Sequence, residues 1–291
     1  MSQLLFHYTS DIGLKGIIES NKIWATSFKN KNDLSEFDYG SRLFSETIIS
    51  ISEKNLFIGE KYRTLLFEYL STELKKITHN FTTSFCTHND HIEKQYGILS
   101  QWRNYAGIGG YAIGFDQEAI IERSGDYTNR FISNTESALA WTMEEFCTYG
   151  TVPHAYLSNF YHFIPNIVHS IINNNVDPIR NEAWFQNFVI SGIKCASLIK
   201  HPAFREEAEF RISYGIFNNR QLVDLHQKNF NGNVIPVLEL FGSCGVVDLI
   251  REIIVGPHVD SGAKVDLLDD FLKGHGIDWV RIREVDLPLR V

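Results

Sequence analysis

Apolar residues alternate with polar ones in some stretches of this chain and recur at helical spacing in others. Alternation predicts strands at 23–26, 81–86, 111–116, 204–214, 251–255 and 278–284. Helical spacing predicts helices at 13–20, 34–53, 60–76 and 263–273. Gly274 suits the C-terminal cap of the last of these helices, because glycine adopts left-handed backbone angles without strain.

The middle of the chain is the most helical part. From 136 to 199 the apolar spacing is mostly helical, with breaks at Pro153, at Asn173–Asn175 and near Pro178. Strands and helices are mixed without strict alternation, which indicates an α+β fold rather than a doubly wound sheet. We find no internal repeat and no Pro/Gly/Ser linker. The pattern therefore predicts one domain over 1–291, with a helical insertion at about 136–199.

Composition narrows the class of protein. The chain has 291 residues, of which 44% are hydrophobic and 13% aromatic, so it can bury a sizeable core. Its net charge of −8 argues against a general coat for nucleic acid, which needs surplus Lys and Arg, although a local basic groove is compatible with it. No apolar run approaches the roughly 20 residues of a membrane helix, and the N-terminus does not resemble a signal peptide. We expect a cytoplasmic protein without a membrane partner.

The four cysteines are Cys86, Cys147, Cys195 and Cys244. They form no Cys-x-x-Cys pair, which argues against structural zinc and favours buried, reduced thiols. A glycine-rich stretch at 107–112 fits the spacing G-x-G-x-x-A of a dinucleotide-binding loop. Such a loop follows a strand and opens a helix, whereas this one precedes a strand pattern, so we interpret it as a turn.

The segment 204–214 has two contrasting faces. At period two, Glu207, Glu209, Arg211 and Ser213 lie on one face of a strand, and apolar residues lie on the other. Each of two carboxylates this close raises the pKa of the other, so the pair suits acid–base chemistry at the mouth of a cleft. The alternative is a solvated strand face on which Arg211 neutralises the acids.

Two further segments carry polar and aromatic side chains. His7, Tyr8 and Thr9 precede a predicted helix, where they can bind ligand hydroxyl groups; the alternative is a partly buried histidine beside a helix cap. Trp102, Arg103 and Tyr105 suit stacking on a flat ring and gripping a phosphate. The same composition also serves as a packing anchor or a protein-binding surface.

The order of these motifs is more specific than any one of them. The chain resembles, from His7 to about Arg290, a widespread bacterial family catalogued as a domain of unknown function. The resemblance is carried by seven motifs in this order: His-Tyr-Thr-Ser at 7–10, Ile-Trp-Ala-Thr at 23–26, Asn-Asp-x-Ser-Glu at 32–36, Ser-Gln-Trp-Arg-x-Tyr at 100–105, Ala-Ile-Gly-Phe-Asp at 112–116, Phe-x-x-Glu-x-Glu-x-Arg at 204–211 and Glu-Ile-Ile-Val-Gly-Pro at 252–257. That family in turn resembles the ADP-ribosyltransferase fold, a mixed β core with site residues on three strands.

The resemblance assigns site residues to those strands. The first strand carries a His or Arg, which His7 matches, and the third carries a Glu, which Glu207-Ala-Glu209 matches. The second carries an aromatic residue or a Ser. For this element the sequence leaves Tyr105 or Trp102 as one choice and Ser84, on the strand 81–85, as the other.

The chemistry implied by the resemblance is cleavage of the nicotinamide–ribose bond of NAD, which is a substrate, without a metal. The ribose becomes cationic on the way, and Glu209, or Glu207 as second choice, stabilises that charge. His7 binds the adenosine ribose. Tyr8, Trp102 or Tyr105 stacks on the nicotinamide, and Arg103 or Arg211 neutralises the pyrophosphate.

The resemblance allows more than one class of acceptor for the ADP-ribose. The resemblance favours a nucleic acid, RNA or DNA, over a host protein, and it implies a toxin-like or anti-phage role with an antitoxin as partner. The alternatives are a non-catalytic module that binds a nucleotide or a partner on the same fold, and an NAD glycohydrolase with water as acceptor.

Overall fold

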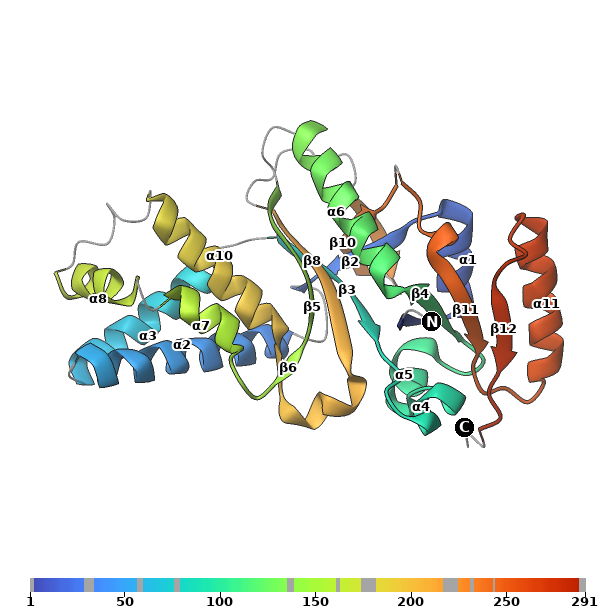
Figure 1. Cartoon of the computed structure of the whole chain (residues 1–291), viewed down its shortest axis with the longest axis horizontal. Coiled ribbons are helices and arrows are strands. Elements are labelled where there is room, and N and C mark those ends of the chain that lie inside the picture. The colour runs from blue at the N-terminus through green and yellow to red at the C-terminus, as the bar shows by residue number, and fades with distance from the viewer. Residues whose placement is uncertain are drawn as a thin grey trace.

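The computed structural model describes residues 3–28, 34–56, 60–75, 79–134, 139–160, 163–173, 182–216, 225–230, 233–242 and 244–287 (Figure 1). Helices and strands are both abundant, and the main sheet is mixed because β11 and β12 are parallel while its other pairs are antiparallel. Figure 1 shows the sheet in the middle, a group of helices to one side and α11 (Ser261–Gly274) at the opposite end.

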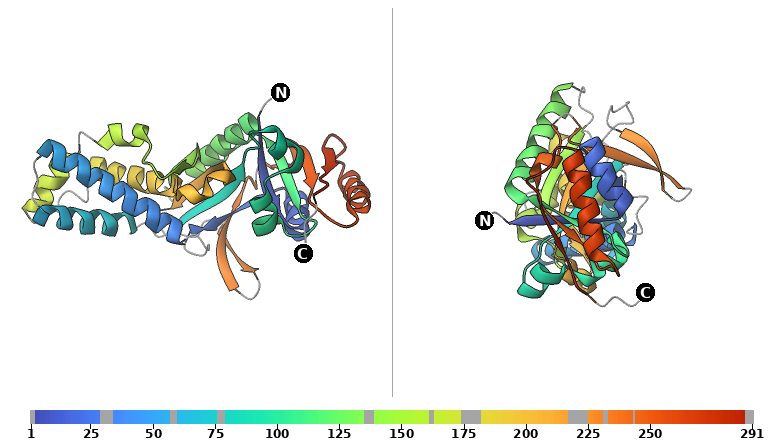
Figure 2. Two further views of the ribbon diagram at one scale, coloured as in Figure 1. Left: turned by 90° about the horizontal axis from the view of Figure 1, so that it is seen from below. Right: turned by 90° about the vertical axis from the view of Figure 1, so that its right-hand side faces the viewer.

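The sheet follows one long path with a branch. The path runs through β12 (Arg281–Glu284), β11 (Ile250–Val255), β4 (Tyr111–Asp116), β1 (Leu4–Thr9), β3 (His79–Cys86), β2 (Ile23–Ser27), β10 (Asn233–Leu240) and β9 (Leu225–Phe230). The branch is β8 (Glu209–Ile216), which pairs with β3 on one side and with β5 (Leu139–Phe146) on the other. The hairpin of β9 and β10 stands away from the body in Figure 2.

Strand β1 lies at the centre of this arrangement. It pairs with β4 over six residues but with β3 through the single pair Phe6 and Cys86. Successive side chains of a strand point to opposite faces, so Leu5 enters one apolar core while Phe6 and Tyr8 enter another. The helix α1 (Asp11–Ser20) follows directly, and Ser10 caps it by accepting a hydrogen bond from the Gly13 N–H at 3.2 Å.

The helical arm has its own core. It consists of α2 (Leu34–Leu56), α3 (Glu60–Lys75), α7 (His154–Phe160), α8 (Ile164–Ile172) and α10 (Ala183–Leu198). Phe44, Phe188 and Ile193 are buried among these helices, and Trp141 and Met143 of β5 join them from the sheet. Within the described residues, no helix is both long and apolar enough to cross a lipid bilayer.

Most of the predicted elements are confirmed, but the predicted helical insertion is wrong at its beginning. Residues 139–146 form β5 and residues 148–149 form β6 (Thr148–Tyr149), while α2 and α3, which lie outside the predicted insertion, belong to the same arm. Trp141 and Met143 alternate with Thr142 and Glu144, which is a strand pattern inside an otherwise helical block. The breaks at 174, 175 and Pro178 lie outside the described residues.

Several more elements differ from the sequence-based expectation. The long helix α6 (Gln117–Asn134) and the β9–β10 hairpin were not predicted. The strand predicted at 204–214 begins only at Glu209, because residues 202–207 form the 3-10 helix η3 (Pro202–Glu207) and Ala208 has a left-handed φ of 41°. The turn predicted at 107–110 is confirmed, and Gly107 and Gly109 have positive φ angles there.

Candidate functional site

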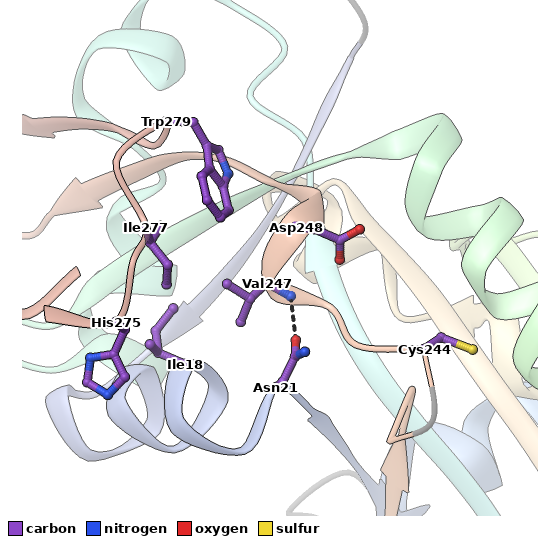
Figure 3. A pocket seen from close by; sticks show the side chains of 8 residues that line it. All are labelled: Ile18, Asn21, Cys244, Val247, Asp248, His275, Ile277 and Trp279. Atoms are coloured by element: carbon purple, nitrogen blue, oxygen red, sulfur yellow. Dashed lines mark hydrogen bonds between the residues drawn. The ribbon is translucent and has the colours of Figure 1, made fainter. Parts of the chain in front are cut away.

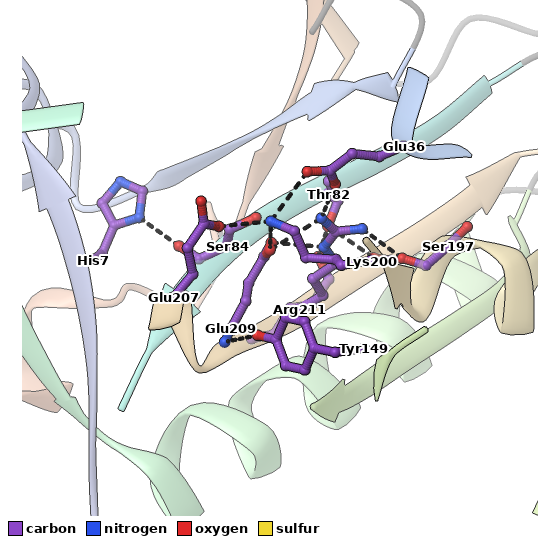
Figure 4. A network of polar contacts seen from close by, with 12 residues as sticks. His7, Glu36, Thr82, Ser84, Tyr149, Ser197, Lys200, Glu207, Glu209 and Arg211 are labelled. Atoms are coloured by element: carbon purple, nitrogen blue, oxygen red, sulfur yellow. Dashed lines mark hydrogen bonds and ion pairs between the residues drawn. The ribbon is translucent and has the colours of Figure 1, made fainter. Parts of the chain in front are cut away.

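A cluster of five charged side chains is buried where the helical arm meets β8 (Figure 4). Glu36 comes from α2, Lys200 from β7 (Ile199–Lys200), Glu207 from η3, and Glu209 and Arg211 from β8. Each of the five is less than a tenth exposed. Charges buried this deeply are stable only when they satisfy one another, because each alone loses its hydration. The solvated strand face considered from the sequence is therefore wrong.

Arg211 is the centre of the cluster. Its Nε donates to Glu209 Oε1 at 2.6 Å and its Nη2 to Glu209 Oε2 at 3.0 Å, which is a two-pronged contact between planar groups. Nη2 also donates to Glu36 Oε2 at 2.7 Å, and Nη1 donates to the Ser197 carbonyl at 2.5 Å. All three nitrogens are thus engaged inside the protein. The predicted role of Arg211 on a pyrophosphate requires it to give up these bonds.

Lys200 gathers the three carboxylates. Its Nζ lies 2.6 Å from Glu207 Oε2, 2.6 Å from Glu209 Oε2 and 3.1 Å from Glu36 Oε1. The cluster contains three carboxylates and two cations, so it carries one net negative charge with all groups ionised. Such a site favours a ligand that is cationic or becomes cationic.

The two glutamates differ in their affinity for a proton. Burial raises the pKa of Glu209, but Arg211 and Lys200 outweigh burial and bring this pKa well below its ordinary value. Burial also raises the pKa of Glu207, Lys200 opposes the rise, and Glu209 adds to it, so this pKa stays above its ordinary value. One carboxylate is therefore held firmly ionised beside another that takes up a proton more readily.

His7 reaches the same region from β1. It is partly exposed, and its Nδ1 donates to the Ser84 carbonyl at 3.0 Å. In the ladder between β3 and β8, Ser84 lies opposite Arg211, and Cys86 lies opposite Glu209. The strands that carry His7, Ser84 and Glu209 are therefore neighbours, and Figure 4 shows Glu207 on the His7 side of Lys200.

Tyr8 and Trp102 serve the core, and the expectation that either stacks on a ligand is not supported by their surroundings. The Tyr8 hydroxyl accepts a hydrogen bond from the Ile98 N–H at 2.8 Å and lies 2.9 Å from His88 Nε2. Trp102 is fully buried, and its Nε1 donates to the Tyr96 carbonyl at 2.8 Å. The two rings meet edge to face with their centroids 4.6 Å apart.

The segment that carries Trp102 has an unusual backbone. It follows α4 (His91–Tyr96) and α5 (Leu99–Gln101) and forms a π-helical turn, η2 (Trp102–Ala106). Such turns add one residue to the helix and reorient the neighbouring side chains. Trp102 enters the core, whereas Arg103 is exposed and Tyr105 is 50% exposed. Of the three ligand contacts predicted in this segment, Arg103 and Tyr105 therefore face outward and Trp102 does not. Thr9, a further predicted contact at the end of β1, is partly exposed.

Sequence reasoning gave no site role to two residues of the cluster, Lys200 and Glu36. Lys200 directly follows the apolar pair Leu198–Ile199, and a lysine in that place is a signal of a buried partner. Glu36 ends the Asn-Asp-x-Ser-Glu motif of the resemblance, but this local pattern is typical of a turn and a helix cap. Two aromatic residues also border the cluster: the Tyr149 hydroxyl accepts from the Glu209 N–H at 2.9 Å, and the ring of Phe204 has its centroid 5.2 Å from Lys200 Nζ.

A separate cavity of about 360 Å³ lies beside α1 and the end of α11 (Figure 3). Ile18, Asn21, Val247, His275 and Trp279 are among its lining residues, and the predicted site residues are not. In the described part of the chain, no group of three or more His, Cys, Asp or Glu side chains is arranged to hold a metal ion.

Comparison with known families gives one match. A family described as a protein of unknown function (DUF2971) matches residues 101–212. No curated protein and no solved structure matches the chain. The expected resemblance to a domain of unknown function is confirmed over this segment, which contains Lys200, Glu207, Glu209 and Arg211 but neither His7 nor Glu36.

The packing of Trp102 gives a stability prediction. We expect Trp102→Ala to lower the free energy of unfolding by about 3–5 kcal/mol, because it opens a cavity and removes the bond to Tyr96. Arg103→Ala, on the exposed side of the same turn, is the control and changes it by about 0.5 kcal/mol or less. Urea unfolding followed by circular dichroism measures both. Equal effects would show that Trp102 is not a packing anchor.

The burial of His88 gives a pH prediction. Burial, together with the positive charge of Arg283, lowers the pKa of His88 to about 3. Below about pH 6.5 the unfolded chain binds a proton at this histidine and the folded chain does not. The free energy of unfolding therefore decreases by up to about 1.4 kcal/mol for each unit by which the pH is lowered. We expect His88→Gln to lose less stability than the wild type between pH 7 and pH 5.

Urea unfolding at pH 7, 6 and 5 measures this difference. The control is His154→Gln, which changes an exposed histidine of α7 and should retain the wild-type pH dependence. The same pH dependence in His88→Gln and in the wild type would show that His88 binds its proton in the folded protein.

Proposed function

We propose that this chain is an NAD-dependent ADP-ribosyltransferase whose reaction centre lies where β1, β3 and β8 bring together His7, Ser84 and the Glu207–Glu209 pair. The neighbouring placement of these three strands is the observation that carries the proposal. It supports Ser84, rather than Tyr105 or Trp102, as the second element of the expected three-strand pattern. In this proposal NAD is a substrate, and the chain's own side chains perform the chemistry.

Glu209 supplies the negative charge that the reaction needs. When the bond between nicotinamide and ribose breaks, its electron pair leaves with the nicotinamide and the ribose becomes cationic. A carboxylate already ionised and fixed in place stabilises this cation without reorganising. Arg211 and Lys200 provide both conditions, because they hold the pKa of Glu209 low and its two oxygens in position.

Glu207 is suited to the acceptor. Its Oε2 is bonded to Lys200, and none of the contacts drawn in Figure 4 involves its other oxygen. The acceptor's nucleophilic atom forms the new bond to the ribose carbon, and its proton passes to Glu207, whose raised pKa favours proton uptake. His7 and Thr9 orient the cofactor from β1, and the exposed Arg103 and Tyr105 remain the candidates for the pyrophosphate and the nicotinamide.

The acceptor in this proposal is a nucleic acid, RNA before DNA, with a host protein as the alternative. A toxin-like or anti-phage role with a neutralising antitoxin is part of the same proposal. The net charge of −8 means that a nucleic acid would have to bind in a local groove rather than over the whole surface.

One observation favours a second candidate, a non-catalytic module on the same framework. Glu209 is only 5% exposed, and both its oxygens already bind cations of the chain. A module of this kind would bind NAD or another nucleotide without releasing nicotinamide. Titration with NAD, together with an assay for nicotinamide release, separates the two. Release that is independent of added RNA or cell extract identifies the third candidate, an NAD glycohydrolase.

The first functional prediction concerns Glu209. We expect Glu209→Gln to lower the rate of nicotinamide release by about a hundredfold or more, because the amide carries no charge to oppose the cationic ribose. The substitution also leaves Arg211 and Lys200 short of a partner, so the unfolding free energy must be measured on the same sample. Glu36→Gln is the matched variant, since it removes a carboxylate from the same two cations.

We expect Glu36→Gln to lose comparable stability but far less activity. Full activity in a folded Glu209→Gln variant would contradict the assignment of Glu209. The assay uses purified protein with NAD at neutral pH, with and without total RNA or extract.

The second functional prediction concerns His7. We expect His7→Ala to weaken NAD binding by about tenfold, because a positioned hydrogen bond to the cofactor is lost. Isothermal titration with NAD measures the affinity, and His154→Ala on the helical arm is the control. Unchanged affinity in His7→Ala would show that His7 does not bind NAD.

A further inference from the structure

The backbone that carries Lys200 is held by pairing with a neighbouring strand. Lys200 ends the two-residue strand β7, which directly follows α10 and pairs in parallel with β6, so that Tyr149 lies opposite Lys200. The Gly150 N–H donates to the Lys200 carbonyl at 2.9 Å. The side chain is 3% exposed and ends among the three carboxylates. The helical arm and the sheet thus both fix the position of this ammonium group.

The contacts of Lys200 are only partly duplicated by Arg211. Arg211 already binds both oxygens of Glu209 and one oxygen of Glu36. For Glu207, by contrast, Lys200 is the cation that the cluster provides. Glu207 also lies before the left-handed Ala208, outside the β8 ladder, so the strand does not fix its side chain. The bond of 2.6 Å to Lys200 is what turns this carboxylate toward Glu209.

We propose that Lys200 is a positioning residue of the reaction centre, which holds the carboxylate of Glu207 beside Glu209 so that Glu207 orients the acceptor. This inference rests on the proposed function and adds to it a residue that neither the motifs nor the family resemblance indicated. Lys200 itself touches no reacting atom in this scheme.

The charges around Glu207 determine how this carboxylate responds when Lys200 is removed. Lys200 faces it from β7, Glu36 from α2 and Glu209 from β8. Arg211 binds the other two glutamates of the cluster. Without Lys200, Glu207 is buried beside two carboxylates with a single cation left in the cluster. It then takes up a proton at higher pH and is no longer directed toward Glu209. Transfer to an oriented acceptor suffers most, whereas water, which is abundant, needs less orientation.

The activity test compares Lys200→Met with Lys200→Arg. For each variant, transfer of labelled ADP-ribose to total RNA or to extract is measured against hydrolysis of NAD. We expect Lys200→Met to lower the ratio of transfer to hydrolysis by about tenfold or more, and Lys200→Arg to restore part of it, because misplaced groups lose their advantage of proximity. An unchanged ratio in Lys200→Met would overturn the proposal.

Two further variants keep the test independent of folding. Lys200→Met leaves three buried carboxylates against one cation. The double variant Glu36→Gln/Lys200→Met removes one carboxylate as well and so restores the original net charge of the cluster. Its reference is the single variant Glu36→Gln. Lys22→Met is the matched control outside the cluster, because Lys22 Nζ also binds a buried carboxylate, that of Glu239, at 2.6 Å.

A second readout does not depend on NAD. The carboxyl carbon of Glu207 is followed by NMR in protein labelled with ¹³C-glutamate, and its signal is assigned by its loss in Glu207→Gln. We expect its titration midpoint to move to higher pH in the double variant relative to Glu36→Gln, and to stay in place in Lys22→Met. An unmoved midpoint overturns the role of Lys200 even where nicotinamide is released. Absence of release in the wild type overturns the proposed function, while the titration still decides whether Lys200 holds Glu207.

Discussion

Arg211 and Lys200, with the carboxylates of Glu36, Glu207 and Glu209, form a closed set of ion pairs in the interior of the protein. Removing any one member leaves other buried charges with fewer partners, which is destabilising because their hydration is not restored. Glu36 comes from α2 of the helical arm and Lys200 from β7, the short strand after α10, while the other three come from β8 and the turn before it. The position of the arm against the sheet therefore depends on this cluster, and so does the shape of the candidate site.

The same ion pairs give neighbouring carboxylates different chemistry. Glu209 is bonded by both cations and stays ionised, whereas Glu207 is bonded by Lys200 alone and has a raised pKa. A fixed negative charge beside a group that accepts a proton is the combination that glycosyl transfer requires. It arises here from the number of cations each carboxylate contacts rather than from any difference in residue type. Strands β1 and β3 bring His7 and Ser84 to the same region.

Side chains alternate between the two faces of a strand, and this gives neighbouring residues of β1 different surroundings. His7 and Tyr8 are neighbours in sequence, yet Tyr8 points into a core with Phe6 and Trp102 while His7 bonds to Ser84. The π-helical turn makes a similar division, because Trp102 is buried and Tyr105 is half exposed. The family resemblance left Tyr8, Trp102 and Tyr105 as alternative stacking groups, and these residues differ in the faces on which they lie.

Local patterns in the sequence predicted the strands β2, β3, β4 and β11 and the helices α1, α2, α3 and α11, because period and capping involve residues only a few positions apart. The choice of His7 and the Glu207–Glu209 pair came from short motifs and from the family resemblance. Tertiary structure alone decided that these glutamates are buried and that Glu36 and Lys200 are their partners. Arg211 and Glu36 are 175 positions apart in the chain. No local spacing encodes such a pair, since its energy exists only after the arm and the sheet have removed both charges from water.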